Sequence, residues 1–146
     1  MATTFQNIDG VIESPKWIIN GLDSVAIRYA ENFGGELSGK QGISSYNGFS
    51  EALSTSQIRN VFGEVKKMQM KGFNETEFLL LKPRLAYACE RKGTKGSKEF
   101  RKVIDKAIDA VMQGRDTDEK KQRFENFAAF FEAILAYHRS FGGKTT

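Results

Sequence analysis

The sequence predicts an all-α fold, a compact bundle of five to six helices. Sustained alternation of apolar and polar residues, which marks half-buried strands, is nearly absent. Several windows instead carry apolar residues at the three- and four-residue spacing of amphipathic helices. The chain has 146 residues, of which 40% are hydrophobic and twelve are Phe, and this suffices to fill one core. We therefore expect a single helical domain over residues 1–146.

The first helix is predicted to begin at Ser14-Pro15, because Ser suits the N-cap and Pro suits the first helical position. Asn20-Gly21 is a candidate break near its beginning. Residues 1–13 before this helix are expected to be flexible. Residues 34–50, which are rich in Gly and Ser, are expected to form a long mobile loop. The apolar stripe of the helix consists of Ile18, Leu22, Val25, Tyr29 and Phe33.

A second helix is predicted to begin at a capping box formed by Ser54 and Gln57, whose side chains can bond free backbone N–H groups at a helix start. It extends to about Lys71 and stops before Gly72, since glycine suits the left-handed conformation common after helix ends. Its apolar face carries Ile58, Val61, Phe62, Val65 and Met68.

Asn74 is predicted to cap the next helical segment, with Glu77 at the capping-box position. Pro83 interrupts this segment, because proline lacks an N–H group and clashes with the preceding turn. Residues 75–81 and 83–92 should therefore form two helical pieces that are joined by a kink.

A basic turn over residues 91–98 is predicted to end that segment, and Ser97 is predicted to cap the following helix. This helix runs to about Gln113 and is amphipathic. Its basic face carries Lys98, Arg101, Lys102 and Lys106. Its apolar face carries Phe100, Val103, Ile104, Ala107, Ile108 and Val111.

The last helix is predicted to be the longest. It begins with Asp116 and Glu119, extends to about Phe141 and stops at Gly142-Gly143, so residues 142–146 are expected to be a flexible tail. Its broad apolar face is typical of a central helix in a bundle. This face includes Phe124, Phe127, Ala128, Phe131, Ile134 and Leu135.

Few residues are available for catalysis or metal binding. Cys89 is the only cysteine and His138 the only histidine, which excludes an internal disulfide and a cysteine-rich zinc site. No catalytic triad, paired-carboxylate or phosphate-binding loop pattern stands out, so we expect no enzymatic activity, no metal and no cofactor. His138 falls on the apolar stripe of the last helix and is predicted to lie in the core or at its boundary. Cys89 is predicted to be a small buried hydrophobe.

The sequence gives no indication of a membrane protein. No stretch approaches the ~20 apolar residues that a bilayer-spanning helix needs. The N-terminus lacks the basic region, apolar run and cleavage site of a signal peptide. We therefore expect a cytoplasmic protein without membrane contact.

Positive charge is concentrated in the middle of the chain. The net charge is +4, and residues 57–106 carry 13 basic and 6 acidic side chains. Clustered Lys and Arg release several counterions together when they bind phosphates, so this segment is a candidate nucleic-acid surface. Arg84, Tyr87 and Arg91 fall at helical spacing within it, which places an aromatic ring between two guanidinium groups. The alternative is a solvated basic face with Tyr87 packed into the core.

Three segments resemble the small all-helical subunit of type III-A CRISPR (Csm) effector complexes. They are residues 53–59 (LSTSQIR), 81–88 (LKPRLAYA) and 130–138 (FFEAILAYH), in the order of the family. The resemblance implies a helical bundle that assembles with other Csm-type subunits and with neighbouring copies of itself. It also implies a non-catalytic role in antiviral defence, in which the subunit contacts the backbone of the guide RNA–target RNA duplex without reading its sequence.

The predicted RNA-binding residues have two origins. The resemblance gives Arg59 and Arg84 by matching positions, and Arg91 follows from the same helix as Arg84. The chain departs from the family pattern at Asn60, where another basic residue is common, and at Glu90, which would locally repel phosphate. Charge alone adds Lys95, Lys98, Arg101 and Lys102.

Two other functions stay open at this point. A helical protein-interaction module would use the basic face against acidic partner surfaces rather than RNA. A stand-alone helical enzyme is motivated only by Tyr137 and His138 near a candidate pocket.

Overall fold

The computed structural model describes residues 8–38, 55–91 and 94–142, with the backbone only for residues 8–12, 55, 57 and 95. Every regular element within these ranges is a helix, which confirms the predicted all-α fold. The elements are α1 (Ile8–Asn20), α2 (Ser24–Ser38), α3 (Thr55–Lys71), α4 (Glu75–Leu79), α5 (Leu81–Glu90), α6 (Lys95–Met112) and α7 (Thr117–Ser140). Since only Leu80 separates α4 from α5, these two form one interrupted helix, and the described chain is a six-helix bundle.

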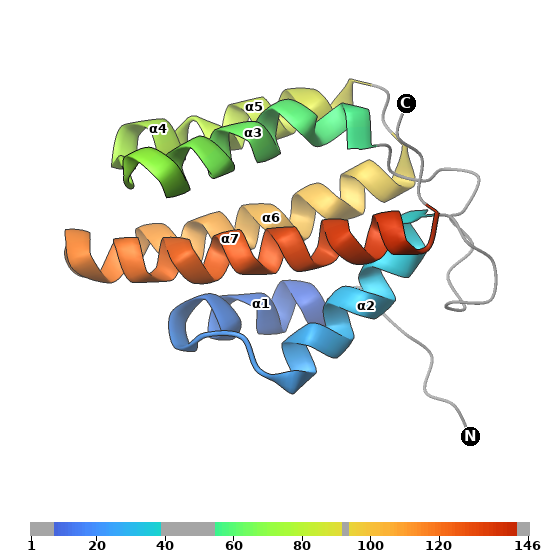
Figure 1. Ribbon diagram of the computed structural model, residues 1–146, viewed down its shortest axis with the longest axis horizontal. Coiled ribbons are helices and arrows are strands. Elements are labelled where there is room, and N and C mark those ends of the chain that lie inside the picture. Colours follow the sequence, from blue (N-terminus) through green and yellow to red (C-terminus); the bar gives the residue numbers. More distant parts are fainter. Residues whose placement is uncertain (1–7, 39–54, 92–93, 143–146) are drawn as a thin grey trace.

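The helices form three layers (Figure 1). The antiparallel helices α6 and α7 make the middle layer, with α3, α4 and α5 on one side and α1 and α2 on the other. α7 packs against α2 and α3, and α6 packs against α1 and α5. The two middle helices therefore hold both outer layers, and α7 has the central position that its broad apolar face predicts.

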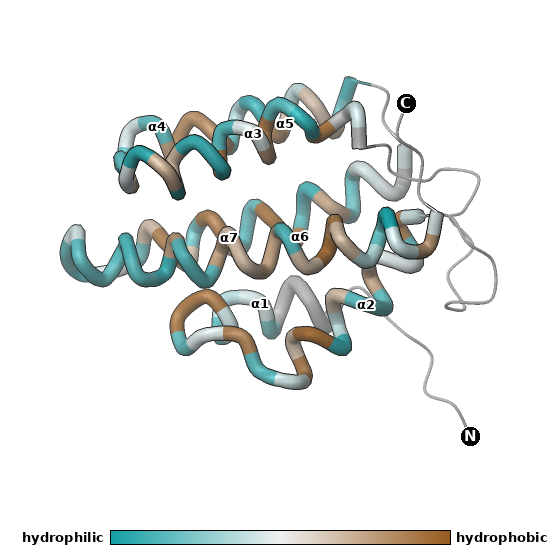
Figure 2. Tube along the Cα trace, in the orientation of Figure 1, coloured by the Kyte–Doolittle hydropathy of each residue, from teal (hydrophilic) through white to brown (hydrophobic). Residues whose placement is uncertain are grey.

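The core between these layers is built largely from aromatic rings. Phe127 of α7, for example, has its ring centroid 5.2 Å from that of Phe78 in α4 and 6.0 Å from that of Phe131. All six residues of the predicted apolar face of α6 are buried. Figure 2 shows the apolar stretches along α6 and α7, and the hydrophilic first turns of α7. The predicted periodicity of these two helices is therefore confirmed.

The first helix begins earlier than predicted. α1 starts at Ile8, so the segment 1–13, predicted to be flexible, is helical in its second half, and Ser14-Pro15 lies inside the helix rather than at its start. Apolar residues at helical spacing extend the pattern upstream of the proline and outweigh the local start signal. The candidate break at Asn20-Gly21 is confirmed. α1 ends there, and Gly21 adopts a φ of +100°, which glycine tolerates best.

The loop predicted over residues 34–50 is wrong for its first five residues. α2 continues to Ser38, and residues 39–50 lie outside the described chain. Gly34 stays helical because α7 packs directly on it: a Cβ atom at this position would lie 2.7 Å from the Cβ of Tyr137. The absence of a side chain at Gly34 allows close packing of α2 on α7 and does not mark a turn.

The predicted helix ends in the middle of the chain are confirmed where they are described. α3 ends at Lys71, and Gly72 adopts a φ of +111°. Asn74 caps α4, its side-chain oxygen accepting a hydrogen bond from the Glu77 backbone N–H at 2.9 Å. The capping box predicted for α3 includes Ser54, which lies outside the described residues.

The kink expected at Pro83 falls at Leu80. α4 ends at Leu79, and α5 runs from Leu81 to Glu90. A proline ring clashes with the carbonyl four residues earlier and cannot donate to it, and for Pro83 this is the carbonyl of Leu79. The break therefore precedes the proline by one turn.

The cap predicted for α6 at Ser97 is wrong, because the N-cap is Thr94. The Thr94 hydroxyl accepts a hydrogen bond from the Ser97 backbone N–H at 3.2 Å. Ser97 is buried, and its hydroxyl donates to the Cys89 carbonyl at 2.6 Å. Ser97 therefore ties the last turn of α5 to the first turn of α6.

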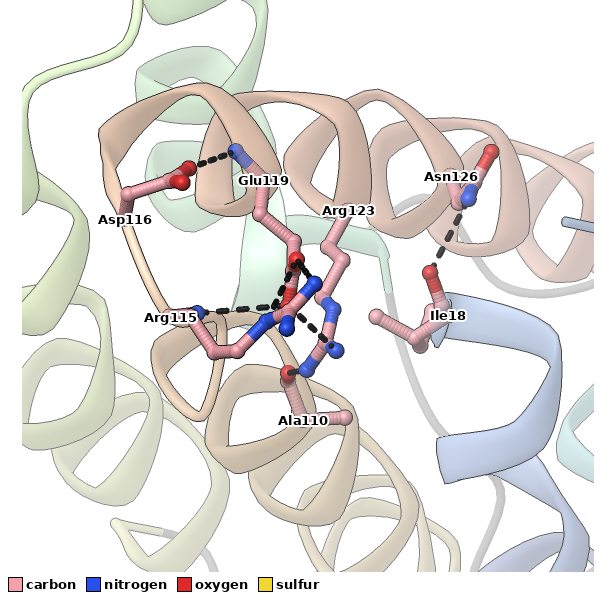
Figure 3. Close-up of polar contacts among 7 residues, drawn as sticks. All are labelled: Ile18, Ala110, Arg115, Asp116, Glu119, Arg123 and Asn126. Atoms are coloured by element: carbon pink, nitrogen blue, oxygen red, sulfur yellow. Dashed lines mark hydrogen bonds and ion pairs between the residues drawn. The ribbon is translucent and has the colours of Figure 1, made fainter. Parts of the chain in front are cut away.

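Charged side chains hold the turn between α6 and α7 (Figure 3). Asp116 caps α7 as predicted, accepting from the Glu119 backbone N–H at 2.9 Å. The Glu119 carboxylate lies 3.2 Å from Arg115 and 2.9 Å from Arg123. The Arg115 backbone N–H, together with these guanidinium groups, holds the pKa of Glu119 below its usual value. Arg123 also donates to the Ala110 carbonyl at 2.8 Å, which links α7 to the end of α6.

Asn126 of α7 joins the N-terminal layer to the middle layer (Figure 3). Its side-chain amide donates at 2.9 Å to the Ile18 carbonyl, one of the carbonyls without an intrahelical partner at the end of α1. We expect Asn126→Ala to lower the free energy of unfolding by about 1 kcal/mol, because a partly buried acceptor loses its donor. Urea unfolding measures the change. The exposed Gln122→Ala on the same helix should stay within about 0.5 kcal/mol of the parent, and equal losses in both variants would contradict this role.

Candidate RNA interface

A groove runs between α3 and α5 on one outer layer. Its volume is about 810 Å³, within the range of ligand-binding clefts. α3 contributes Asn60 and Glu64, and α5 contributes Arg84, Tyr87 and Ala88, with Arg91 directly after its end. The predicted basic and aromatic stripe of α5 therefore lines one concave surface.

The Tyr87 ring is exposed on this surface. Because 70% of the residue is accessible to solvent, the alternative that Tyr87 packs into the core is wrong. Arg84 lies one turn before it and Arg91 one turn after it, and all three line the groove. An aromatic face flanked by two guanidinium groups is thus open to a ligand.

Glu64 balances part of the positive charge in the groove. Its carboxylate lies 3.6 Å from Arg84 and 3.5 Å from Lys67. Exposed pairs of this kind are weak, so Arg84 can exchange Glu64 for a phosphate at little cost. Arg91 has no ion pair with any described residue. Sequence reasoning does not identify Glu64, although it follows Asn60, the departure from the family pattern, by one helical turn.

A second groove of about 390 Å³ lies between α3 and α7. The helical register places this second groove on the face of α3 opposite to the first groove. Arg59 therefore lies on a different face of α3 from the one that lines the groove with Arg84 and Arg91. Arg139 joins Arg59 here only through the packing of α3 on α7, which no local pattern in the sequence indicates. The groove is lined by Ile58, Arg59, Phe62, Glu132, Leu135, Ala136 and Arg139.

Arg101 is the least available of the predicted RNA-binding residues. Its half-buried guanidinium lies 3.2 Å from Glu90 and 3.4 Å from Asp105. The ion pair between Arg101 and Glu90 joins α6 to α5, so this guanidinium stabilises the packing of the two helices. Glu90, which the sequence suggests would repel phosphate, is neutralised by the same contact.

The lysines of α6 are more accessible. Lys98 is exposed on the first turn and has no ion pair with a described residue. Lys102 is exposed as well and lies 3.5 Å from Glu99, one turn before it. Lys95 is the first residue of α6, and only its backbone is described.

The helix ends bring these basic residues to one end of the bundle (Figure 1). α3 begins, α5 ends and α6 begins at the same end, on the right of the view. Arg59 lies near the start of α3, Arg91 directly follows α5, and Lys98 lies near the start of α6. Cations that are distant in sequence therefore lie toward one end of the bundle, although Arg59 and Arg91 line different grooves there.

The single cysteine and the single histidine of the chain are both buried. His138 of α7 and Cys89 of α5 have no exposed surface, which confirms their predicted core positions. Burial raises the pKa of the Cys89 thiol to about 12, so the thiol stays protonated at neutral pH. In the described part of the chain, no cluster of His, Cys, Asp and Glu is suited to hold a metal ion. None of the described helices has the length and apolar character to span a bilayer.

Comparison with curated proteins and with solved structures gives no match. The family model of Csm2 Type III-A matches residues 25–144, which is most of the chain. The matched range contains α3 to α7, and therefore every helix that lines the two grooves. The chain belongs to the Csm2 type III-A family, that of the small subunit of the type III-A CRISPR effector.

Proposed function

We propose that this chain is a non-catalytic subunit of its effector that contacts the guide RNA–target RNA duplex through the RNA backbone. It assembles in the cytoplasm with other Csm-type subunits and with neighbouring copies of itself, and it acts in antiviral defence. The family membership supports the assembly. The groove between α3 and α5 carries the proposal of RNA contact, because Arg84 and Arg91 flank an exposed aromatic ring there.

The predicted cations are proposed to contribute unequally. Arg84 and Arg91 contact phosphates at the groove, where neither is held by more than a weak exposed pair. Arg101 contributes least, since two carboxylates already share its guanidinium. The remaining cations extend the RNA-binding surface beyond the groove, and they are Arg59, Lys95, Lys98 and Lys102.

A non-catalytic role is supported by the burial of the two residues best suited to acid–base or nucleophilic catalysis. General acid–base catalysis by histidine and nucleophilic attack by a thiolate both require access to the substrate. His138 and Cys89 are fully buried in the core. The subunit is therefore proposed to hold the target RNA and not to cut it.

The double variant Arg84→Ala/Arg91→Ala is expected to weaken target-RNA binding by the assembled effector about tenfold at low salt, since two exposed ion pairs worth up to about 1 kcal/mol each are lost. The loss should be equal for unrelated guide and target sequences, because phosphates carry no sequence information. The slope of log affinity against log salt should become shallower by about two. Titrations with labelled target RNA at several salt concentrations measure both quantities.

Lys121→Ala is the matched control for this experiment. Lys121 is exposed in the first turns of α7, at the opposite end of the bundle from the basic helix ends (Figure 1). Its removal deletes one positive charge and should leave affinity and slope unchanged. Parent affinity and slope in the double variant would refute the groove as an RNA site.

A second role, as a protein-interaction module, is favoured by the groove between α3 and α7. Phe62 and Leu135 give it an apolar lining, and Arg59, Glu132 and Arg139 add charges of both signs. This composition is typical of protein interfaces with an apolar centre and a polar rim. Footprinting of RNA in the assembled effector separates the two roles. Protection that weakens in the Arg84 and Arg91 variants supports RNA contact, and unchanged protection supports protein contact alone.

A further inference from the structure

The groove between α3 and α5 has a feature that backbone contact with a duplex does not use. Tyr87 is among the most exposed large side chains of the described chain, with 70% of its surface accessible. None of the described aromatic rings lies against it. A flat aromatic face offers stacking rather than charge, and phosphates gain nothing from it.

The surroundings of the ring also fit a nucleobase. Arg84 and Arg91 lie on either side of Tyr87, and a rise of ~10 Å along the helix separates their Cα atoms. This spacing leaves the ring accessible between two cations. Bases stack on aromatic rings and on guanidinium planes, while flanking cations hold the adjacent phosphates.

Glu64 gives the site a preference among bases. A carboxylate accepts hydrogen bonds and repels phosphate, so its place in the groove suits a base edge with donor groups. Adenine, cytosine and guanine each carry an exocyclic amine that can donate to a carboxylate. Uracil has an acceptor oxygen on each side of its single ring N–H, and it is therefore disfavoured. Asn60, one turn earlier on α3, adds an amide to the same groove.

We infer that the groove binds one unpaired nucleotide, with its base stacked on Tyr87 and its exocyclic amine donating to Glu64. Arg84 and Arg91 bind the phosphates on either side. The base must be unpaired, because neighbouring base pairs cover both faces of a base inside a duplex. This inference rests on the proposed function, that this face binds RNA, and adds the class of ligand that the groove recognises.

The test uses the purified full chain and short fluorescent RNAs of equal length, single-stranded oligoadenosine and oligouridine and one blunt duplex. Anisotropy should show tighter binding of oligoadenosine than of oligouridine or the duplex. Tyr87→Ala should weaken oligoadenosine binding roughly 5- to 100-fold, the contribution of one stacked base. Tyr87→Phe keeps the ring and should bind within about twofold of the parent. Glu64→Gln should reduce the preference for oligoadenosine over oligouridine.

A direct readout of stacking comes from 2-aminopurine within the single strand, because its fluorescence is quenched when it stacks. Quenching by the parent and by Tyr87→Phe, but not by Tyr87→Ala, is the expected result. Parent affinity in Tyr87→Ala, or no single-strand binding by the parent chain, overturns the inference. Both outcomes leave the proposed function standing, because the Arg84 and Arg91 variants test that function in the assembled effector with duplex target.

Discussion

Gly34→Ala should destabilise the bundle by about 3 kcal/mol or more. A Cβ atom at this position would lie 2.7 Å from the Tyr137 Cβ, 2.8 Å from the His138 nitrogen and 2.8 Å from the Ile134 oxygen. Two of these atoms belong to the α7 backbone, so no side-chain rotation relieves the clash. α2 must move away from α7, and the aromatic core between the outer and middle layers opens with it. Urea unfolding monitored by circular dichroism measures the loss.

Gly63→Ala is the matched control. Gly63 also lies inside a helix, α3, but a Cβ atom there meets nothing within 4 Å. Alanine at such a position should stabilise the protein by up to about 1 kcal/mol, through its better helix propensity. The two glycine variants should therefore shift the unfolding midpoint in opposite directions. A stable Gly34→Ala protein would show that α2 and α7 do not approach each other as closely as described.

Glu36→Gln should stabilise the protein at high pH and much less at low pH. Glu36 is buried near the end of α2, with 7% of its surface exposed, and one carboxylate oxygen has no hydrogen-bond partner. Burial, and then the negative charge of Glu99, raises the pKa of Glu36 from 4.5 to about 8. The folded chain therefore holds a proton that the unfolded chain loses above pH 4.5.

The sign of the pH dependence follows from this difference in proton binding. Between pH 4.5 and 8 the folded state binds more protons at Glu36 than the unfolded state, so stability falls as pH rises through this window. A glutamine side chain cannot ionise, and the advantage of the Glu36→Gln variant should grow by on the order of 3 kcal/mol from pH 5 to pH 9. Urea unfolding at several pH values measures it. Glu31→Gln, at an exposed position on the same helix, should track the parent at every pH. Parallel profiles for Glu36→Gln and the parent would contradict the raised pKa of the buried Glu36 carboxyl.

The sequence predicts most helix ends because capping is local. Asn74 and Asp116 each reach the backbone N–H three residues later, and that geometry depends only on neighbouring residues. The prediction that Ser97 caps α6 is wrong because of a tertiary contact. Thr94 caps the helix three residues earlier, and the packing of α5 on α6 assigns the Ser97 hydroxyl to the Cys89 carbonyl.

The loop predicted for the glycine-rich segment is wrong for a similar reason. Gly34-Gly35 resembles a turn when only its neighbours in sequence are considered. Its helical conformation follows from close packing against Tyr137, which lies far along the chain. Local propensity is a weak guide wherever a distant helix fills the space that a side chain would occupy.

In the candidate site, too, the features that depend on one helix could be predicted, and those that depend on the packing of two helices could not. The stripe of Arg84, Tyr87 and Arg91 could be predicted, because all three lie on one face of one helix. Periodicity does not say which neighbour covers that face, so it left the exposure of Tyr87 open. The second wall of the groove, with Glu64, depends on the pairing of α3 with α5 and was not predicted.

The layered arrangement also governs how the chain folds as it is made. α1 and α2 are synthesised before α6 and α7, yet they contact each other little and pack mainly on those later helices. Their apolar side chains, Ile18 and Phe33 among them, lack most of the surface they pack on until α6 and α7 have left the ribosome. Burial of the core therefore waits for α6 and α7, and the nascent α1 and α2 depend on these later helices.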